Sequence, residues 1–157
     1  TVDRIRVATS SGQNLRLHPD TGAVAGTDTA LAYASGGGAP RVLATAYTYN
    51  NVDPKITTMY VIDAAGATLG IVGSKEGAQP AVSPNTGRIT PVGPLGVGPF
   101  ETASLDIHVL SNRAFAVLGG RGGPSRWVAV DLATGRGTVV GLIAGGEPVR
   151  AFSFESW

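Results

Sequence analysis

Two histidines are the first residues to test for metal chemistry. His18 and His108 are far apart in the sequence, and neither has a second His, Asp or Glu at a metal-ligand spacing such as that of His-Glu-x-x-His. The chain contains no cysteine, which excludes thiolate nucleophiles and cysteine-based zinc sites. The sequence therefore predicts neither a metal site nor another cofactor, and we interpret both histidines as solvent-facing strand residues.

The serines and glycines do not form a recognisable catalytic or phosphate-binding loop. No Gly-x-Ser-x-Gly nucleophile elbow occurs. The Gly-rich stretches 36–38 and 119–123 lack the Lys-Ser/Thr pair of a phosphate loop and do not open a helical pattern. We interpret both stretches as turns.

Thr1 supports one enzymatic hypothesis. An exposed N-terminal threonine can use its own α-amino group as the base that activates its hydroxyl, as in the N-terminal-nucleophile hydrolases. Cleavage of a longer precursor immediately before Thr1 would create such a nucleophile. An amide hydrolase of this type is the alternative to a non-enzymatic function, and whether the chain is an enzyme stays open.

A set of polar residues lies inside otherwise apolar strand patterns. Such residues line a ligand site when their strands border a channel or its mouth. The other interpretation is solvent-facing alternation along half-exposed strands, together with buried Arg–Asp pairs. The ligand-binding candidates are Arg4, Arg6, Asn14, Arg16, Tyr47, Asn50, Asp106 and His108.

A repeated strand–turn–strand phrase must position these residues. It occurs at 14–24, 59–69 and 127–138, with a shorter echo at 83–90. Each full phrase has a strand pattern, a turn that combines Asp with Thr-Gly or Ala-Gly, and a second strand. The Asp can cap turn N–H groups, and Gly can adopt a positive φ. We expect hairpin turns in which Gly22, Gly66 and Gly135 have positive φ.

The strand candidates group into units of blade size. The stretch 104–143 contains four successive strands, and about forty residues in four antiparallel strands is the size of a propeller blade. We predict an all-β, β-propeller-like array of about three four-stranded blades within a single repeat domain, residues 1–157. A strand at 149–154 would start a fourth blade of a larger ring. A β-sandwich or an open β-stack also fits the pattern. Further strand candidates are 4–9, 42–49, 105–110, 114–118, 126–130 and 138–143.

The composition of the chain limits the classes of partner that we expect. The formal net charge is +1 and charged residues make up 15% of the chain, so no general attraction to nucleic acid or anionic lipid is expected. No apolar run approaches the ~20 residues of a membrane-spanning helix. We therefore expect neither nucleic-acid binding nor membrane insertion.

The sequence resembles the bacterial family catalogued as domain of unknown function 4394. The resemblance covers nearly the whole chain in order. It implies a propeller-type repeat protein, often exported, of which this chain is the C-terminal portion, and hence an extracellular or periplasmic location. It supplies no catalytic residue. The segments that carry it are 2–7, 12–17, 19–22, 46–51, 87–97, 105–107 and 132–135.

The resulting functional hypothesis is a non-enzymatic, secreted or cell-surface module for ligand binding or interaction. Its terminal sheets should each leave one apolar face uncovered. Phe152, Phe154 and Trp157 fall in the last six positions, where an uncovered strand would expose them. We expect the partner to be the missing N-terminal propeller segment or a second copy of the chain.

Overall fold

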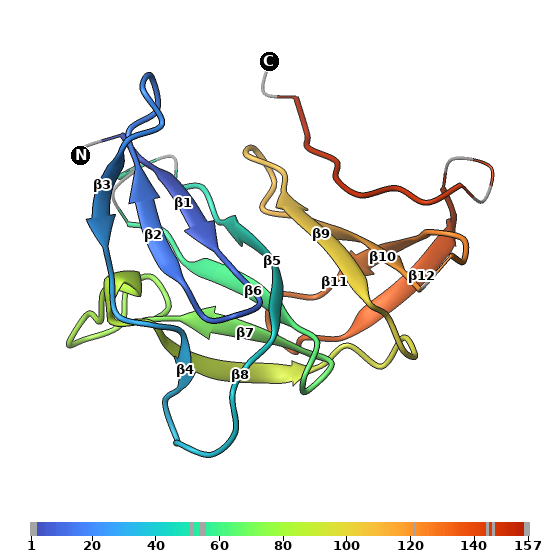
Figure 1. Cartoon of the computed structure of the whole chain (residues 1–157). Coiled ribbons are helices and arrows are strands. Elements are labelled where there is room, and N and C mark those ends of the chain that lie inside the picture. The colour runs from blue at the N-terminus through green and yellow to red at the C-terminus, as the bar shows by residue number, and fades with distance from the viewer. Residues whose placement is uncertain are drawn as a thin grey trace.

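The computed structural model describes residues 3–50, 52–53, 56–120, 122–143, 145 and 147–155. It confirms an all-β chain, with three open sheets (Figure 1). One short 3₁₀ turn with described bounds, Pro84–Thr86, lies at the shorter echo 83–90. None of the described helices is long and apolar enough to cross a membrane.

The three sheets follow one another along the chain. Sheet A has the order β1-β2-β3, with β1 (Ile5–Ala8), β2 (Asn14–Leu17) and β3 (Val24–Thr27). Sheet B has the order β4-β8-β7-β6-β5, with β4 (Ala32–Tyr33), β5 (Val42–Tyr47), β6 (Met59–Asp63), β7 (Thr68–Val72) and β8 (Arg88–Pro94). Sheet C has the order β12-β11-β10-β9, with β9 (Thr102–Ile107), β10 (Ala114–Gly119), β11 (Arg126–Val130) and β12 (Gly137–Leu142).

The expected four-stranded unit is found in sheet C only. Sheet A has three strands and sheet B has five, because the two-residue β4 pairs in parallel with β8 instead of joining sheet A. The strands β5 and β9, which are edges of their sheets, lie side by side (Figure 1). No sheet closes on itself, and the ring stays a prediction.

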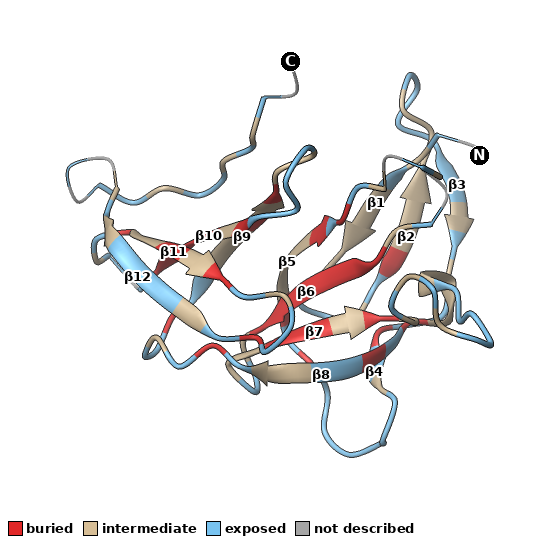
Figure 2. Ribbon diagram, turned by 180° about the vertical axis from the view of Figure 1, so that it is seen from behind, coloured by how far each residue is buried: buried red, intermediate tan, exposed pale blue. Residues whose placement is uncertain are grey.

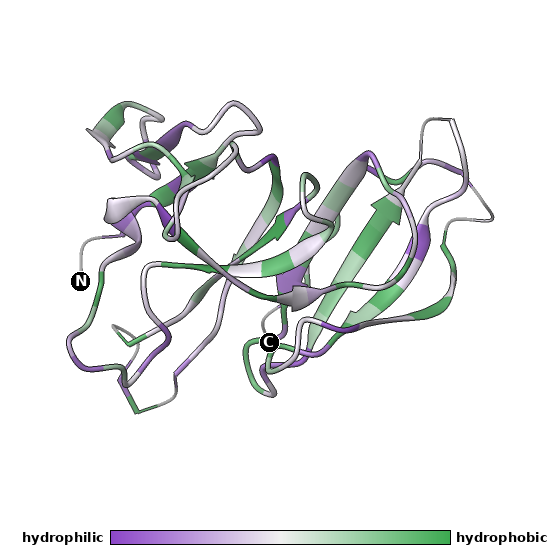
Figure 3. Ribbon diagram, turned by 90° about the horizontal axis from the view of Figure 1, so that it is seen from below, coloured by the Kyte–Doolittle hydropathy of each residue, from purple (hydrophilic) through white to green (hydrophobic). Residues whose placement is uncertain are grey.

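Sheet B is the central layer, and its strand β6 is buried along its whole length (Figure 2). Successive side chains of a strand point to opposite faces. Tyr60 and Ile62 accordingly enter a core shared with sheet C, whereas Met59 and Val61 enter a second core on the other face. A strand covered on both sides needs a continuous apolar sequence, which explains the run from Met59 to Ile62. Figure 3 shows a similarly hydrophobic colour along the strands of sheet C.

Sheet A has one polar and one apolar face. Arg6 pairs with Arg16 and Ala8 with Asn14 across β1 and β2, and this face contacts sheet B. The opposite face carries aliphatic side chains that join neither core of the described residues, namely Ile5, Val7, Leu15, Leu17 and Val24.

Four hairpin turns share one backbone form. The residue four positions after the first turn residue has positive φ in each turn: Gly22, Ala67, Asn112 and Gly135. The prediction is therefore confirmed for Gly22 and Gly135 and wrong for Gly66, because the phrase at Asp63 places glycine one residue too early. Positive φ at an alanine is uncommon, and at an asparagine less so.

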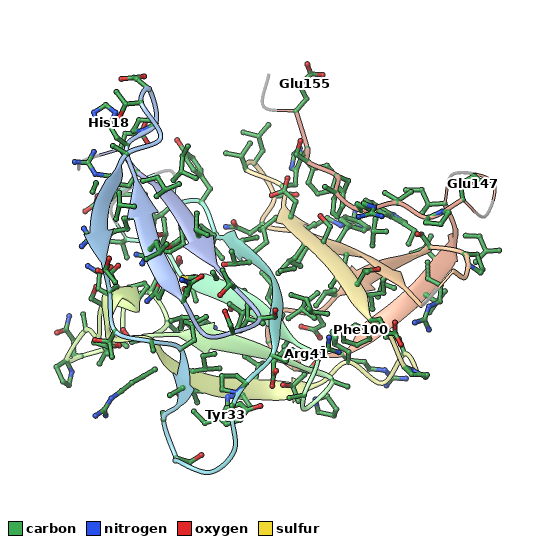
Figure 4. The ribbon with its side chains drawn as sticks, viewed as in Figure 1. His18, Tyr33, Arg41, Phe100, Glu147 and Glu155 are labelled. Atoms are coloured by element: carbon green, nitrogen blue, oxygen red, sulfur yellow. The ribbon has the colours of Figure 1, made fainter. Side chains whose placement is uncertain are left out.

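Both histidines occupy the first position of such a turn. His18 N–H donates to Ala23 O at 2.8 Å and His108 N–H donates to Arg113 O at 3.0 Å, as Asp131 N–H donates to Arg136 O at 2.9 Å. Figure 4 shows His18 at the tip of the β2–β3 hairpin. The 108–113 turn is a further member of the repeat, which the sequence pattern concealed because asparagine replaces glycine.

The C-terminal segment 149–154 forms no strand, contrary to our expectation. Its N–H groups donate to side chains instead of to a neighbouring strand: Val149 to Ser125 Oγ at 2.8 Å, Phe152 to Ser104 Oγ at 3.2 Å and Phe154 to Asp106 Oδ2 at 2.7 Å. The rings of Phe152 and Phe154 pack on sheet C, so they are half-buried. Trp157 lies outside the described residues.

Candidate functional site

Four of the eight predicted ligand-binding residues converge between sheets A and B, around Arg6. Arg6 Nε donates to Tyr47 Oη at 3.2 Å, and Arg6 Nη1 donates to Asn14 Oδ1 at 2.7 Å. Arg6 Nη1 also donates to Asp28 Oδ2 at 2.6 Å, and Nη2 donates to Asn85 Oδ1 at 2.7 Å. We call the set Arg6, Asn14, Arg16, Asp28, Tyr47 and Asn85 the arginine cluster.

Asp28 is the charge centre of the arginine cluster. Arg16 binds it in a bidentate manner, at 2.9 Å from Nε and 2.8 Å from Nη2, and the Asp28 side chain is only 6% exposed. Burial alone would raise the pKa of Asp28, but the hydrogen bonds from Arg16 and Arg6 outweigh it and lower the pKa. The hydrogen bonding between Arg16 and Asp28 also raises the pKa of Arg16.

The residues of the arginine cluster bind one another between the sheets and do not form an open ligand site. Asn14 is buried, and its amide donates to Thr29 O at 3.2 Å and to Pro84 O at 3.1 Å. Since the polar groups of Arg6, Asn14 and Asp28 already have partners, a ligand would have to displace existing hydrogen bonds. Sequence reasoning missed Asp28, which lies outside the repeated phrases, and Asn85, which lies in the echo at 83–90 but was not singled out as a ligand-binding residue.

The other four predicted residues lie elsewhere. Arg4 Nη1 donates to Asp3 O at 2.6 Å, and Asn50 Oδ1 accepts the N–H groups of Val52 and Asp53, each at 2.9 Å. Asp106 binds the C-terminal segment, and His108 makes an edge contact with Phe154 at 5.5 Å between ring centroids. The eight residues therefore do not form a single site.

His108 and Ser111 require a test for nucleophilic chemistry, because His108 Nδ1 lies 3.0 Å from Ser111 Oγ. A catalytic base of this type is oriented by a third group. Asp106 does not supply it, since its two oxygens accept the N–H groups of Ile107 at 2.8 Å and Phe154 at 2.7 Å. We assign the pair to the hairpin turn.

An open cleft lies between sheets B and C. Its volume is about 480 Å³, within the ~300–1,000 Å³ range of small-molecule sites. Sheet B contributes its β5–β6 and β7–β8 ends, and sheet C contributes the turns that follow β9 and β11. We call it the inter-sheet cleft. It is lined by Thr48, Thr58, Tyr60, Lys75, Glu76, Asn112, Arg113, Ala114, Phe115, Ala129, Val130, Asp131, Leu132 and Ala133.

One wall of the inter-sheet cleft is a chain of hydrogen bonds. Thr48 Oγ1 donates to Glu76 Oε2 at 3.0 Å and accepts Thr58 N–H at 2.8 Å. Thr58 Oγ1 accepts Glu76 N–H at 2.9 Å. These reciprocal bonds fix the Glu76 carboxylate at the end of β5 and the start of β6. Fixed polar groups recognise a ligand with less loss of side-chain entropy than mobile ones.

The opposite wall carries charges of both signs. Arg113 lies over the Phe115 ring at 5.5 Å, and backbone N–H groups of the turn, first that of Ala133, lower the pKa of Asp131. Tyr60 Oη donates to Leu132 O at 3.3 Å, and burial, followed by the charge of Glu76, raises the pKa of Tyr60. At neutral pH the cleft therefore presents a neutral phenol among two cations and two carboxylates.

The described residues offer little for metal chemistry. Within them, no three His, Cys, Asp or Glu side chains lie together as a metal site. Thr1, the nucleophile of the hydrolase hypothesis, lies outside the described residues.

Sequence reasoning missed two charged residues of the inter-sheet cleft, Lys75 and Glu76. Their only signal was an adjacent pair of opposite charges between glycines and small residues.

Comparison with known proteins identifies a matching family model but no individual related protein. The family model described as "Domain of unknown function (DUF4394)" matches residues 1–153. No curated protein and no solved structure matches the chain.

Proposed function

Because the chain belongs to the DUF4394 family, whose function is unknown, we propose its function from the structure: a non-enzymatic module that binds a small polar ligand in the inter-sheet cleft. The observation that carries this proposal is the meeting of two sheets around a cleft of about 480 Å³ lined by hydroxyl, phenol, carboxylate and cationic groups. A few convergent polar groups in a concave site are the usual basis of ligand recognition.

The free charges of the cleft select the class of ligand. Lys75 and Arg113 have no ion-pair partner among the described residues, and Arg113 lies over the face of Phe115. Glu76 retains one carboxylate oxygen beyond its bond to Thr48. A ligand with an anionic group toward Lys75 and Arg113, and a hydroxyl or amine toward Glu76, uses all three. Amino acids and sugar acids have this chemistry.

The test is a thermal-shift screen with amino acids and sugar acids, followed by calorimetric titration of each hit. We expect at least one hit, whose affinity falls at least tenfold in a Lys75→Ala, Arg113→Ala double variant, because charge-assisted hydrogen bonds contribute about 1.5–3 kcal/mol each. The matched control is Arg88→Ala plus Arg136→Ala, which removes two exposed cations outside the cleft. A screen without hits, or equal loss in both double variants, contradicts the proposal.

We further propose that the three sheets are blades of a larger propeller-like ring on a secreted or cell-surface protein, located outside the cell or in the periplasm. The succession of mainly antiparallel sheets and the side-by-side strands β5 and β9 support this arrangement. The apolar outer face of sheet A is where a further sheet would pack, from an N-terminal propeller segment or from a second copy. Co-expression with the upstream segment tests it. A segment that fails to co-purify and leaves sheet A amide signals unchanged contradicts it.

A further inference from the structure

The outer strands of the three sheets differ in how well they are protected against pairing. An exposed sheet edge presents unpaired N–H and C=O groups, and natural proteins keep such edges short, charged or covered. The outer strand of sheet B, β4, has two residues, and β3 of sheet A has four. The outer strand of sheet C, β12, has six. It is the longest of the three.

β12 pairs with β11 on one side only. A bulge leaves Val140 without an opposite residue on β11, since Val128 pairs with Val139 and Trp127 pairs with Gly141. On the free side, Gly137 N–H donates to Leu95 O at 2.8 Å, and this contact covers the beginning of the strand. Figure 2 shows β12 as a largely exposed arrow at the margin of the molecule.

Three side chains of β12 are apolar and exposed. Val139, Val140 and Leu142 are 46%, 61% and 65% exposed. The strand Gly137–Leu142 contains no charged residue and no proline. Apart from the bulge at Val140 and the covered beginning at Gly137, it therefore lacks the features that prevent edge-to-edge pairing. We infer that β12 is a self-association edge, where the β12 strand of a second copy adds antiparallel and joins two sheets C into one.

The second copy is the occupant that the charges favour. A neutral edge faces its own copy without repulsion, and an isologous two-fold contact sets Val139 and Val140 against the same residues. Parallel addition would place Arg136 of one copy beside Arg136 of the other. Antiparallel addition instead places Arg136 of one copy near the end of β12 in the other copy, the end that leads to Glu147. Figure 4 shows Glu147 beyond the end of β12. The opposite charges at the two ends therefore also specify the antiparallel direction.

Sedimentation velocity from low to high micromolar protein tests the inference. We expect a monomer–dimer equilibrium, weakened at least tenfold by Val140→Lys, since the ammonium would face its own copy across the two-fold axis. The control is Leu110→Lys in the β9–β10 turn, where the leucine is 68% exposed and lies outside both β12 and the outer face of sheet A. This variant should leave the dimer unchanged. Circular dichroism establishes that both variants fold.

Disulfide trapping supplies a second measurement that does not depend on a destabilising charge. The chain has no cysteine, so Val140→Cys introduces a single thiol. We expect oxidation to link two copies of this variant rapidly and two copies of Leu110→Cys only slowly. A wild-type chain that stays monomeric at all concentrations, or equal cross-linking of the two variants, overturns the inference.

Discussion

Gly135 lies against the backbone of Gly93, and this contact joins the β11–β12 turn of sheet C to β8 of sheet B. A Cβ at position 135 would stand 2.6 Å from Gly93 O, and the φ of Gly135 is +80°. We expect Gly135→Ala to lower the unfolding free energy by about 2–4 kcal/mol, because it adds both backbone strain and an overpacked contact. Urea denaturation measures the change.

Gly22 is the matched control for Gly135. It has φ +69° at the equivalent position of the β2–β3 turn, and nothing lies within 4 Å of an added Cβ. Gly22→Ala should therefore cost only the strain of the left-handed backbone, about 1 kcal/mol. If the two substitutions cost the same, the contact between Gly135 and Gly93 does not limit packing.

Asp28 should hold the arginines of β1 and β2 in place through charge. Asp28→Asn removes the carboxylate that Arg6 and Arg16 share, and we expect a loss of about 2–3 kcal/mol, less than the ~3–5 kcal/mol of a fully buried pair. The reason for the smaller loss is that the Arg16 side chain is 34% exposed. The exposed Asp20→Asn should change the unfolding free energy by less than about 0.5 kcal/mol. Equal effects in the two variants would contradict the assigned role.

The lowered pKa of Asp28 also predicts a pH dependence. A carboxyl whose pKa is lower in the folded than in the unfolded chain stabilises the fold above the unfolded pKa of about 3.9. That contribution is lost as the pH falls through the folded pKa. We expect unfolding free energies measured between neutral pH and acid to decline in this range, with a smaller decline in Asp28→Asn.

The strands and their pairing could be predicted from the sequence only in part. The bounds of β11 agree with the expected 126–130, because this strand ends at a turn residue, and β2 lies within the expected phrase at 14–24. The pairing of β4 with β8 could not be predicted, because a two-residue strand has no periodicity and its partner is more than fifty residues away along the chain.

The candidate site was harder to predict than the strands. Arg6 and Arg16 could be singled out because they interrupt apolar strands, and their pairing across β1 and β2 follows from the hairpin. Glu76, Thr48 and Arg113 could not, since they come from loops and turns of two sheets whose relative placement depends on core packing.

Asp63 should hold together the two ends of the 34–40 loop, because Tyr33 and Arg41 both bind it. The Tyr33 hydroxyl donates to Asp63 Oδ2, and Arg41 N–H donates to Asp63 Oδ1 at 2.7 Å; Figure 4 shows Tyr33 and Arg41. Burial and the Asp63 carboxylate raise the pKa of Tyr33 to about 12. Since the unfolded value is about 10, its contribution is present below pH ~10 and declines as the pH rises toward 12. Absorbance titration should show a phenol that titrates near pH 12 and is lost in Tyr33→Phe, whereas the raised pKa of Tyr60 remains. A wild-type curve without the phenol near pH 12 contradicts the contact.

The aromatic contact between the C-terminal segment and sheet C gives the last prediction. The Trp127 ring stacks on Phe115 at 5.1 Å and meets Phe152 edge-on at 4.8 Å, while Phe154 contacts Phe115 at 5.6 Å. In a Trp157→Phe background, Trp127 is the single tryptophan, so its emission reports this contact directly.

We expect Phe152→Ala with Phe154→Ala to shift Trp127 emission to longer wavelength and increase quenching by acrylamide, because water replaces two rings on the face of sheet C. The expected loss of unfolding free energy is about 1–3 kcal/mol, smaller than for fully buried phenylalanines because both rings are half-buried. Glu155→Ala, an exposed change in the same segment, should leave the emission unchanged. Since the segment is held by hydrogen bonds to Ser104, Ser125 and Asp106 rather than by a strand ladder, the rings must supply much of its attachment. An emission spectrum unaffected by the double substitution would show that the segment does not cover sheet C in solution.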